Sequence, residues 1–143
     1  MTALKQVGAL PVRRSRKGVL EVLLVSSRDT GRWVIPKGWP SKRMTDAAAA
    51  AREARQEAGV SGKIASKTYG TYRYRKIDKS RIRVIEVTVY VLRVKKEKKR
   101  WQEQDQRQRA WFDIETAARK VREPRLRSLI AGLSKPEAAA VPA

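Results

Sequence analysis

Two carboxylates, Glu53 and Glu57, stand four residues apart in the run GWPSKRMTDAAAAAREARQEAGV, which covers residues 38–60. On a helix, residues at this spacing lie one turn apart on one face, and Gln56 shares that face. Like charges so placed repel each other unless a cation lies between them. Mg²⁺ is the usual divalent cation for oxygen ligands such as carboxylates. The spacing therefore predicts a divalent-metal site carried by a helix.

The residues around these carboxylates predict a loop, a helix and a second loop. Pro40 and its neighbours favour a turn, and Thr45 is expected to cap a helix that covers residues 47–58. Gly59 supplies the left-handed residue that ends such a helix. One face of the helix is small enough to lie close against a sheet, because it carries only alanine: Ala47, Ala50, Ala51, Ala54 and Ala58.

This stretch resembles the Nudix box, whose pattern is G, five residues, E, seven residues, R-E-U-x-E-E-x-G-U, with U an aliphatic residue. The positions that match are Gly38, Arg52, Glu53, Glu57, Gly59 and Val60, with Ala54 as a smaller apolar residue at the first U. Met44 stands where the family has its first Glu, and Gln56 replaces the first Glu of the E-E pair. We expect Met44 to pack against apolar neighbours.

Within the Nudix family, the chain is similar to the diphosphoinositol polyphosphate and diadenosine polyphosphate hydrolases. The similarity rests on four further segments, at residues 22–28, 32–36, 89–92 and 109–112. It implies a hydrolase that cleaves a phosphoanhydride bond in a polyphosphate-rich small molecule, with nucleoside polyphosphates also open as substrates. It implies an α/β/α sandwich with a mixed sheet.

The resemblance also assigns roles to individual residues. It implies that Glu53 and Glu57 bind the catalytic Mg²⁺ or Mn²⁺, and that Arg52 orients these carboxylates. A metal ion of this kind places positive charge on the oxygens where negative charge accumulates as the anhydride breaks. The carbonyl of Lys37, next to Gly38, is expected to add a backbone ligand.

Gln56 conflicts with the roles that the resemblance implies. In the diphosphoinositol and diadenosine polyphosphate hydrolases the matching Glu is the proton acceptor, and an amide cannot accept a proton. Three explanations stay open: a base elsewhere, a substitution that traps substrate, or a degenerate Nudix-like polyphosphate-binding protein. Glu103 is the first candidate for another base, and Glu86 and Asp105 are weaker ones. We expect weak or impaired hydrolysis, and we predict that Gln56→Glu raises turnover by well over tenfold.

Basic residues form a second candidate set. Ser26, Ser27 and Arg28 match the segment that binds phosphates in the diphosphoinositol group, and Gly38 is also predicted to contact the substrate. Further cations are expected around the same mouth, where guanidinium groups bind phosphate bidentately and ammonium groups act as point charges: Lys5, Arg13, Lys37, Lys42 and Arg43. For any one of these residues, solvated surface charge is an equally good interpretation.

Composition limits the chemistry and the partners. The chain of 143 residues has no cysteine and no histidine, which excludes thiolate metal sites, disulfides and imidazole catalysis. A net charge of +20 attracts polyanions: phosphorylated small molecules, nucleic acid or an anionic membrane surface. Nucleic-acid binding or RNA-end processing is the less favoured alternative, although residues 95–100 form a basic run. We expect a cytoplasmic protein with no membrane span, and the sequence does not predict its oligomeric state.

The remaining pattern predicts one α/β domain over residues 1–133 and a loose tail over residues 134–143. The predicted strands cover residues 5–12, 19–26, 33–35, 62–75, 82–94 and 110–112, and two further helices cover 113–121 and 124–133. Ile85, Val87, Val89 and Val91 form one apolar face of the longest strand. Strands interleaved with helices in this order favour a mixed sheet with helices on both faces.

Overall fold

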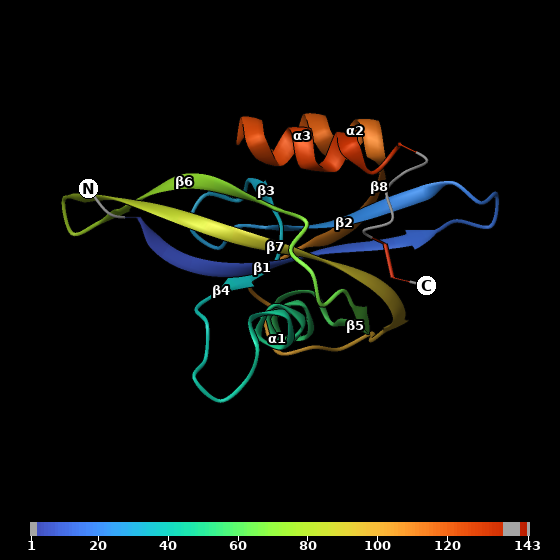
Figure 1. Cartoon of the computed structure of the whole chain (residues 1–143), viewed down its shortest axis with the longest axis horizontal. Helices are drawn as coiled ribbons and strands as arrows, with labels where there is room; N and C mark the ends of the chain where they lie inside the picture. Colours follow the sequence, from blue (N-terminus) through green and yellow to red (C-terminus); the bar gives the residue numbers. More distant parts are fainter. Residues whose placement is uncertain (1–2, 136–140, 143) are drawn as a thin grey trace.

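Three layers make up the protein in the computed structural model, which describes residues 3–135 and 141–142 (Figure 1). A twisted sheet lies in the middle, α1 (Asp46–Ala58) covers one face, and α2 (Ile114–Lys120) and α3 (Pro124–Gly132) cover the other. This arrangement confirms the predicted α/β/α sandwich with a mixed sheet. No helix of the described residues is long and apolar enough to cross a membrane.

The sheet is built around β1 (Leu4–Arg14), which runs parallel to β7 (Arg81–Glu97) and antiparallel to β2 (Leu20–Ser26). The main strand order is β3-β2-β1-β7-β5, while β4 pairs with β1, β6 with β7 and β8 with β2. The shorter members are β3 (Trp33–Val34), β4 (Lys37–Gly38), β5 (Val60–Ile64), β6 (Gly70–Asp78) and β8 (Arg109–Asp113).

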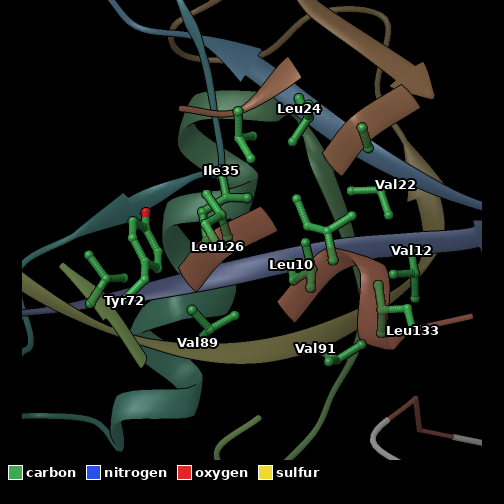
Figure 2. Packing of buried hydrophobic residues seen from close by; sticks show 14 of the residues in the cluster. Leu10, Val12, Val22, Leu24, Ile35, Tyr72, Val89, Val91, Leu126 and Leu133 are labelled. Carbon is green, nitrogen blue, oxygen red and sulfur yellow. The ribbon is translucent and has the colours of Figure 1, made fainter. Parts of the chain in front are cut away.

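Apolar side chains fill both gaps between the sheet and the helices. The predicted apolar face of β7, from Ile85 to Val91, is fully buried at its alternate positions and packs under α2 and α3. Leu126 of α3 lies in this cluster beside Leu10 of β1 and Ile35 (Figure 2). On the other face, the alanines of α1 contact a second cluster that includes Leu23. Burial of the apolar side chains in this second cluster holds α1 against the sheet.

Helix α1 has the predicted ends. The Thr45 hydroxyl oxygen accepts a hydrogen bond from the Ala48 N–H at 3.1 Å, and Gly59 has the left-handed φ of 68°. The alanine face is rotated slightly from the predicted one, because its fully buried members are Ala49, Ala50, Ala54 and Ala58. Small side chains on this face bring the helix, and its carboxylates, close to the sheet.

Two strand predictions need correction. The single strand expected over residues 62–75 is divided into β5 and β6, because both pair with the one long strand β7: Ile64 opposite Leu92, and Gly70 opposite Val89. β4 was not expected, and it pairs antiparallel with β1 beside Val7.

The extent of the domain and the loose tail remain predictions. Residues 136–140 and 143 of that tail lie outside the described residues, while Val141 packs against the core cluster under α2 and α3.

Candidate active site

A cleft of about 570 Å³ brings the two predicted metal ligands together. Glu53 and Glu57 from α1 line it, and β4 and the loop after β2 supply other walls. Glu103, from the long connection between β7 and β8, lines the same cleft. With Asp29 from the loop after β2, the cleft is lined by four carboxylates from three segments that are far apart in the sequence.

The short strand β4 lies directly against both carboxylates of α1. The backbone N–H of Lys37 donates to Glu57 Oε1 at 3.3 Å. A side chain at Gly38 would collide with the carboxylate of Glu53, so only glycine leaves room for it there. This close approach explains in physical terms why Gly38 is part of the motif.

Glu57 is the buried member of the pair, with 4% of its surface exposed. Burial raises the pKa of its carboxyl to about 7, although the positive charges of Arg107 and Lys37 act in the opposite direction. Burial also lowers the pKa of Lys37 to about 8, against the attraction of Glu57. Burial makes ionisation of Glu57 costly, and a cation bound at its carboxylate would stabilise the ionised form.

Arg52 contacts the second carboxylate, as the resemblance implies for an orienting residue. Its Nε lies 3.5 Å from Glu53 Oε2, and its Nη2 donates to the carbonyl of Trp39 at 3.4 Å. The guanidinium thus connects the catalytic helix to the loop that precedes it.

Gln56 does not line the cleft. Its side chain lies in a neighbouring hollow on the flank of α1, together with Arg55 and Trp101. Its backbone carbonyl accepts a hydrogen bond from the N–H of Glu103 at 3.1 Å, which fixes the β7–β8 connection against the end of the helix. Of the three predicted base candidates outside the helix, Glu103 is the one that lines the cleft.

The other two predicted bases lie elsewhere. Glu86 is held by salt bridges to Lys5 and Arg73 on the exposed side of the sheet, and Asp105 is exposed and does not line the cleft. Neither carboxylate is placed to meet a substrate in this cleft.

Four predicted substrate-binding residues line the cleft: Ser27, Arg28, Lys37 and Gly38. Arg28 is exposed at the rim and donates to Gln106 Oε1 at 3.1 Å, without a carboxylate partner in the described residues. Lys37 lies deeper, with its ammonium 5.1 Å from the centre of the Tyr74 ring.

The other predicted substrate-binding residues do not line it: Ser26, Lys5, Lys42, Arg43 and Arg13. Ser26 instead exchanges hydrogen bonds with Gln108, whose N–H donates to the Ser26 hydroxyl at 2.8 Å. Lys42 and Arg43 are exposed on the loop before α1, where closeness in sequence to the motif did not bring their side chains inward. Met44, by contrast, packs against the apolar cluster under α1 as expected.

Arg107 is a central residue of the site that the sequence analysis missed. Its Nε donates to Glu103 Oε1 at 2.8 Å, its Nη2 lies 3.8 Å from Glu57 Oε1, and its Nη1 donates to the Ser26 carbonyl at 3.1 Å. Its four-residue separation from Glu103 was the one available indication of this pairing.

Further cations at the rim were also missed: Arg32, Arg75, Lys76 and Arg122. Arg32 is paired with Glu123 at 2.8 Å, whereas the other three make no salt bridge within the described part of the chain. Arg75 and Lys76 come from the β6–β7 hairpin, and the many basic residues of this hairpin could have indicated that it binds phosphate. The cleft therefore combines the buried or half-buried carboxylates Glu53, Glu57 and Glu103 with exposed charged side chains that are mostly cationic, and these exposed cations form no salt bridge within the described part of the chain.

The cleft offers oxygen atoms of Glu53 and Glu57 as ligands for a divalent metal ion. Among the described residues, no group of three or more His, Cys, Asp or Glu side chains is arranged to hold a metal ion. Mg²⁺, however, is commonly held by one or two carboxylates together with water and substrate phosphates. Glu53 and Glu57 fit that mode of binding, and the carbonyl of Lys37 stays a predicted ligand.

Comparison with known proteins agrees with this geometry. The family model for the NUDIX domain matches residues 3–133. The chain is 34% identical over 122 residues to Nudix hydrolase 16, mitochondrial, of Arabidopsis thaliana, which covers 82% of this chain and 67% of that protein. It is 35% identical over 116 residues to human diphosphoinositol polyphosphate phosphohydrolase 3-alpha, covering 79% of this chain and 66% of that one. Among such curated relatives, the matched part spans between about half and two thirds of their length.

Solved structures share the fold at low sequence identity. A binary complex of the C. elegans Ap4A hydrolase has a TM-score of 0.67 at 20% identity, covering 92% of this chain and 96% of that chain. The NUDIX domain of Shewanella oneidensis NrtR, crystallised with ADP ribose, has a TM-score of 0.69 at 14% identity and covers 94% and 90% of the two chains.

Proposed function

The chain belongs to the Nudix family, and from this membership we propose that it is a metal-dependent hydrolase of a phosphoanhydride bond in a polyphosphate-rich small molecule. The observation that carries the proposal is the placement of Glu53 and Glu57 in one cleft that is also lined by several cations, of which Arg28, Arg75, Lys76 and Arg122 form no salt bridge among the described residues. Diphosphoinositol polyphosphates, diadenosine polyphosphates and nucleoside polyphosphates are the candidate substrates. The first two classes follow relatives and structural neighbours named for them.

The carboxylates of the cleft and its exposed cations have different roles. Glu53 and Glu57 would hold Mg²⁺ or Mn²⁺, which supplies positive charge for phosphoryl oxygens as negative charge builds up on them. Arg52 keeps the Glu53 carboxylate in place through its salt bridge. Arg28, Arg75 and Lys76 would bind the phosphates that lie away from the bond that breaks.

Glu103 is our candidate for the group that accepts the proton from the attacking water. Two carboxylates of the cleft do not come from α1, Glu103 and the exposed Asp29, and of these Glu103 is held in place by a hydrogen bond from Arg107. The amide at Gln56, at a position where the related hydrolases carry Glu, supports the expectation of slow hydrolysis.

Phosphate release from a panel of polyphosphates, with and without Mg²⁺, tests the proposal. The panel needs a diphosphoinositol polyphosphate, diadenosine tetraphosphate and a nucleoside triphosphate, and the control is the Glu53→Gln variant. Magnesium-dependent release that this variant lacks supports the proposal. No release from any of the compounds contradicts it.

A polyphosphate-binding protein without useful catalysis is the second candidate. Gln56 and the lack of a ready three-carboxylate group among the described residues favour it. Calorimetric binding of a polyphosphate without turnover would identify this function. Recovery of turnover in Gln56→Glu would show that the rest of the machinery is intact.

Two broader expectations belong to the same proposal. The net charge of +20 leaves nucleic acid as a possible partner, and binding to duplex and single-stranded nucleic acid at increasing salt concentration tests it. If the protein shows no affinity near physiological salt, nucleic acid is not its partner. We also propose a cytoplasmic location, which cell fractionation tests, since some plant relatives are named as mitochondrial.

A further inference from the structure

Arg107 lies between two acidic residues of the cleft, where it joins three separate parts of the fold. Its guanidinium contacts Glu103 of its own connection, Glu57 of α1 and the carbonyl of Ser26 at the end of β2. Only 10% of its side chain is exposed, compared with 6% for Glu57 and 15% for Glu103. The contact set is therefore an internal ion cluster and not a surface salt bridge.

A cation is required at this position because the carboxylates are removed from water. An unpaired buried carboxylate is strongly destabilising, and a guanidinium that reaches both groups offsets that cost. The Lys37 ammonium is the other cation that acts on Glu57, and the backbone N–H of the same residue donates to the Oε1 that faces Arg107. Positive charge thus stands at the very carboxylate that a metal ion would use.

We propose that Arg107 is an internal counter-ion that competes with the divalent metal for Glu57. In this state the free protein binds metal weakly. A phosphorylated ligand in the cleft pairs with Arg107, because guanidinium binds phosphate oxygens bidentately, and so frees Glu57 for metal. Arg107 acts as a positioning residue, and the inference rests on the proposed function in one respect: that Glu57 is a metal ligand.

This competition couples two binding events. An oxyanion that draws Arg107 away raises the metal affinity, and by thermodynamic linkage the metal raises the affinity for the oxyanion by the same factor. Coupling between sites commonly amounts to a factor of about 5 to 150. Metal and substrate would then load together, and the free protein would stay largely without metal at low concentrations of the ion.

The test is a direct measurement of Mn²⁺ binding by electron paramagnetic resonance, in sodium chloride and in sodium sulfate of equal ionic strength. Sulfate serves as the oxyanion probe because it binds Mn²⁺ weakly in solution. We expect sulfate to tighten Mn²⁺ binding by the wild type, and Arg107→Ala to tighten it by about tenfold in chloride. Sulfate should then have little further effect on that variant.

The matched control is Arg32→Ala, which removes an equal charge from the same cleft. Arg32 is paired with Glu123 and makes no contact with Glu57 or Glu103 in the described residues. Arg107→Lys keeps the charge and should bind Mn²⁺ nearly as the wild type does. If Arg107→Ala unfolds, as thermal denaturation would reveal, Arg107→Gln removes the charge but keeps a hydrogen-bond donor to Glu103.

Three outcomes overturn the inference. Equal tightening in the Arg32 and Arg107 variants would mean that only the general field of the cleft matters. Weaker binding after removal of Arg107 would mean that it holds the ligands in place, and no Mn²⁺ binding in any variant would refute competition altogether. A wild type that shows the sulfate effect but releases no phosphate from the substrate panel would refute the proposed hydrolysis and leave the competition standing.

Discussion

Replacing Glu57 with Gln should stabilise the metal-free protein at neutral pH. The ordinary pKa of 4.5 applies to the unfolded chain, and burial raises the pKa to about 7 in the folded one. Between these values the folded protein keeps a proton that the unfolded chain has lost, so stability falls as the pH rises through this window. The glutamine variant lacks the titration, and its stability should not fall for this reason.

The size of the effect follows from the same pKa values. Each unit of difference corresponds to about 1.4 kcal/mol, so the wild type should lose about 3 kcal/mol relative to Glu57→Gln between pH 4 and pH 7. For a domain of this size, that corresponds to roughly 6–12 °C in melting temperature. Nearly all of the difference should appear above pH 4.5 and level off above pH 7.

Urea denaturation of both proteins across this pH range measures the effect, with EDTA present to remove metal. The control is Glu115→Gln, which changes a carboxylate whose side chain is 85% exposed and should leave the pH dependence as in the wild type. Adding Mg²⁺ at pH 7.5 should stabilise the wild type and not the Glu57 variant. Parallel stability curves for the wild type and Glu57→Gln would refute the buried, costly carboxylate on which the reasoning depends.

Three further predictions concern activity. Glu53→Gln should lower magnesium-dependent phosphate release by at least about a hundredfold, because one of two carboxylate ligands is lost; a change under tenfold would remove Glu53 from the metal site. Because Gln56 lies outside the cleft, we expect Gln56→Glu to change turnover by less than about tenfold, and a rise of well over tenfold, as the sequence alone predicted, would place the base at position 56. Gly38→Ala should abolish turnover and weaken Mn²⁺ binding, because the added methyl group collides with the Glu53 carboxylate; a variant with wild-type metal affinity would contradict that contact.

Local sequence was sufficient to predict the catalytic helix and the central strand. Thr45 and Gly59 fix the ends of α1 through their own hydrogen bonding and backbone preference, and neither depends on distant contacts. The alternating valines of β7 determine which face is buried, because a strand exposes successive side chains to opposite sides. The same local regularity placed Glu53 and Glu57 together.

The parts that could not be predicted depend on contacts between distant segments. The division between β5 and β6 arises because both pair with β7, and no residue between them breaks a strand as strongly as proline would. Arg107 becomes important only when the β7–β8 connection folds back over the end of α1. Lys42 and Arg43 were expected at the mouth because they precede the helix in sequence, but nearness along the chain does not fix the direction of a side chain.

The balance of charge in the cleft connects the unusual residue of the motif with the residue that the sequence analysis missed. Gln56 removes a negative charge from the helix, and Arg107 adds a buried positive charge against Glu57 and Glu103. Both differences make the field around the carboxylates more positive, Arg107 from inside the cleft and Gln56 from the flank of α1 outside it. A more positive field weakens the attraction for a divalent cation and strengthens the attraction for a polyanion. A cleft with this balance would meet the phosphorylated ligand first and complete its metal site around the bound phosphates. The metal affinity of the free protein would then be lower than the affinity of its complex with the phosphorylated ligand. Hydrolysis by this protein should therefore be assayed across metal concentrations with substrate present.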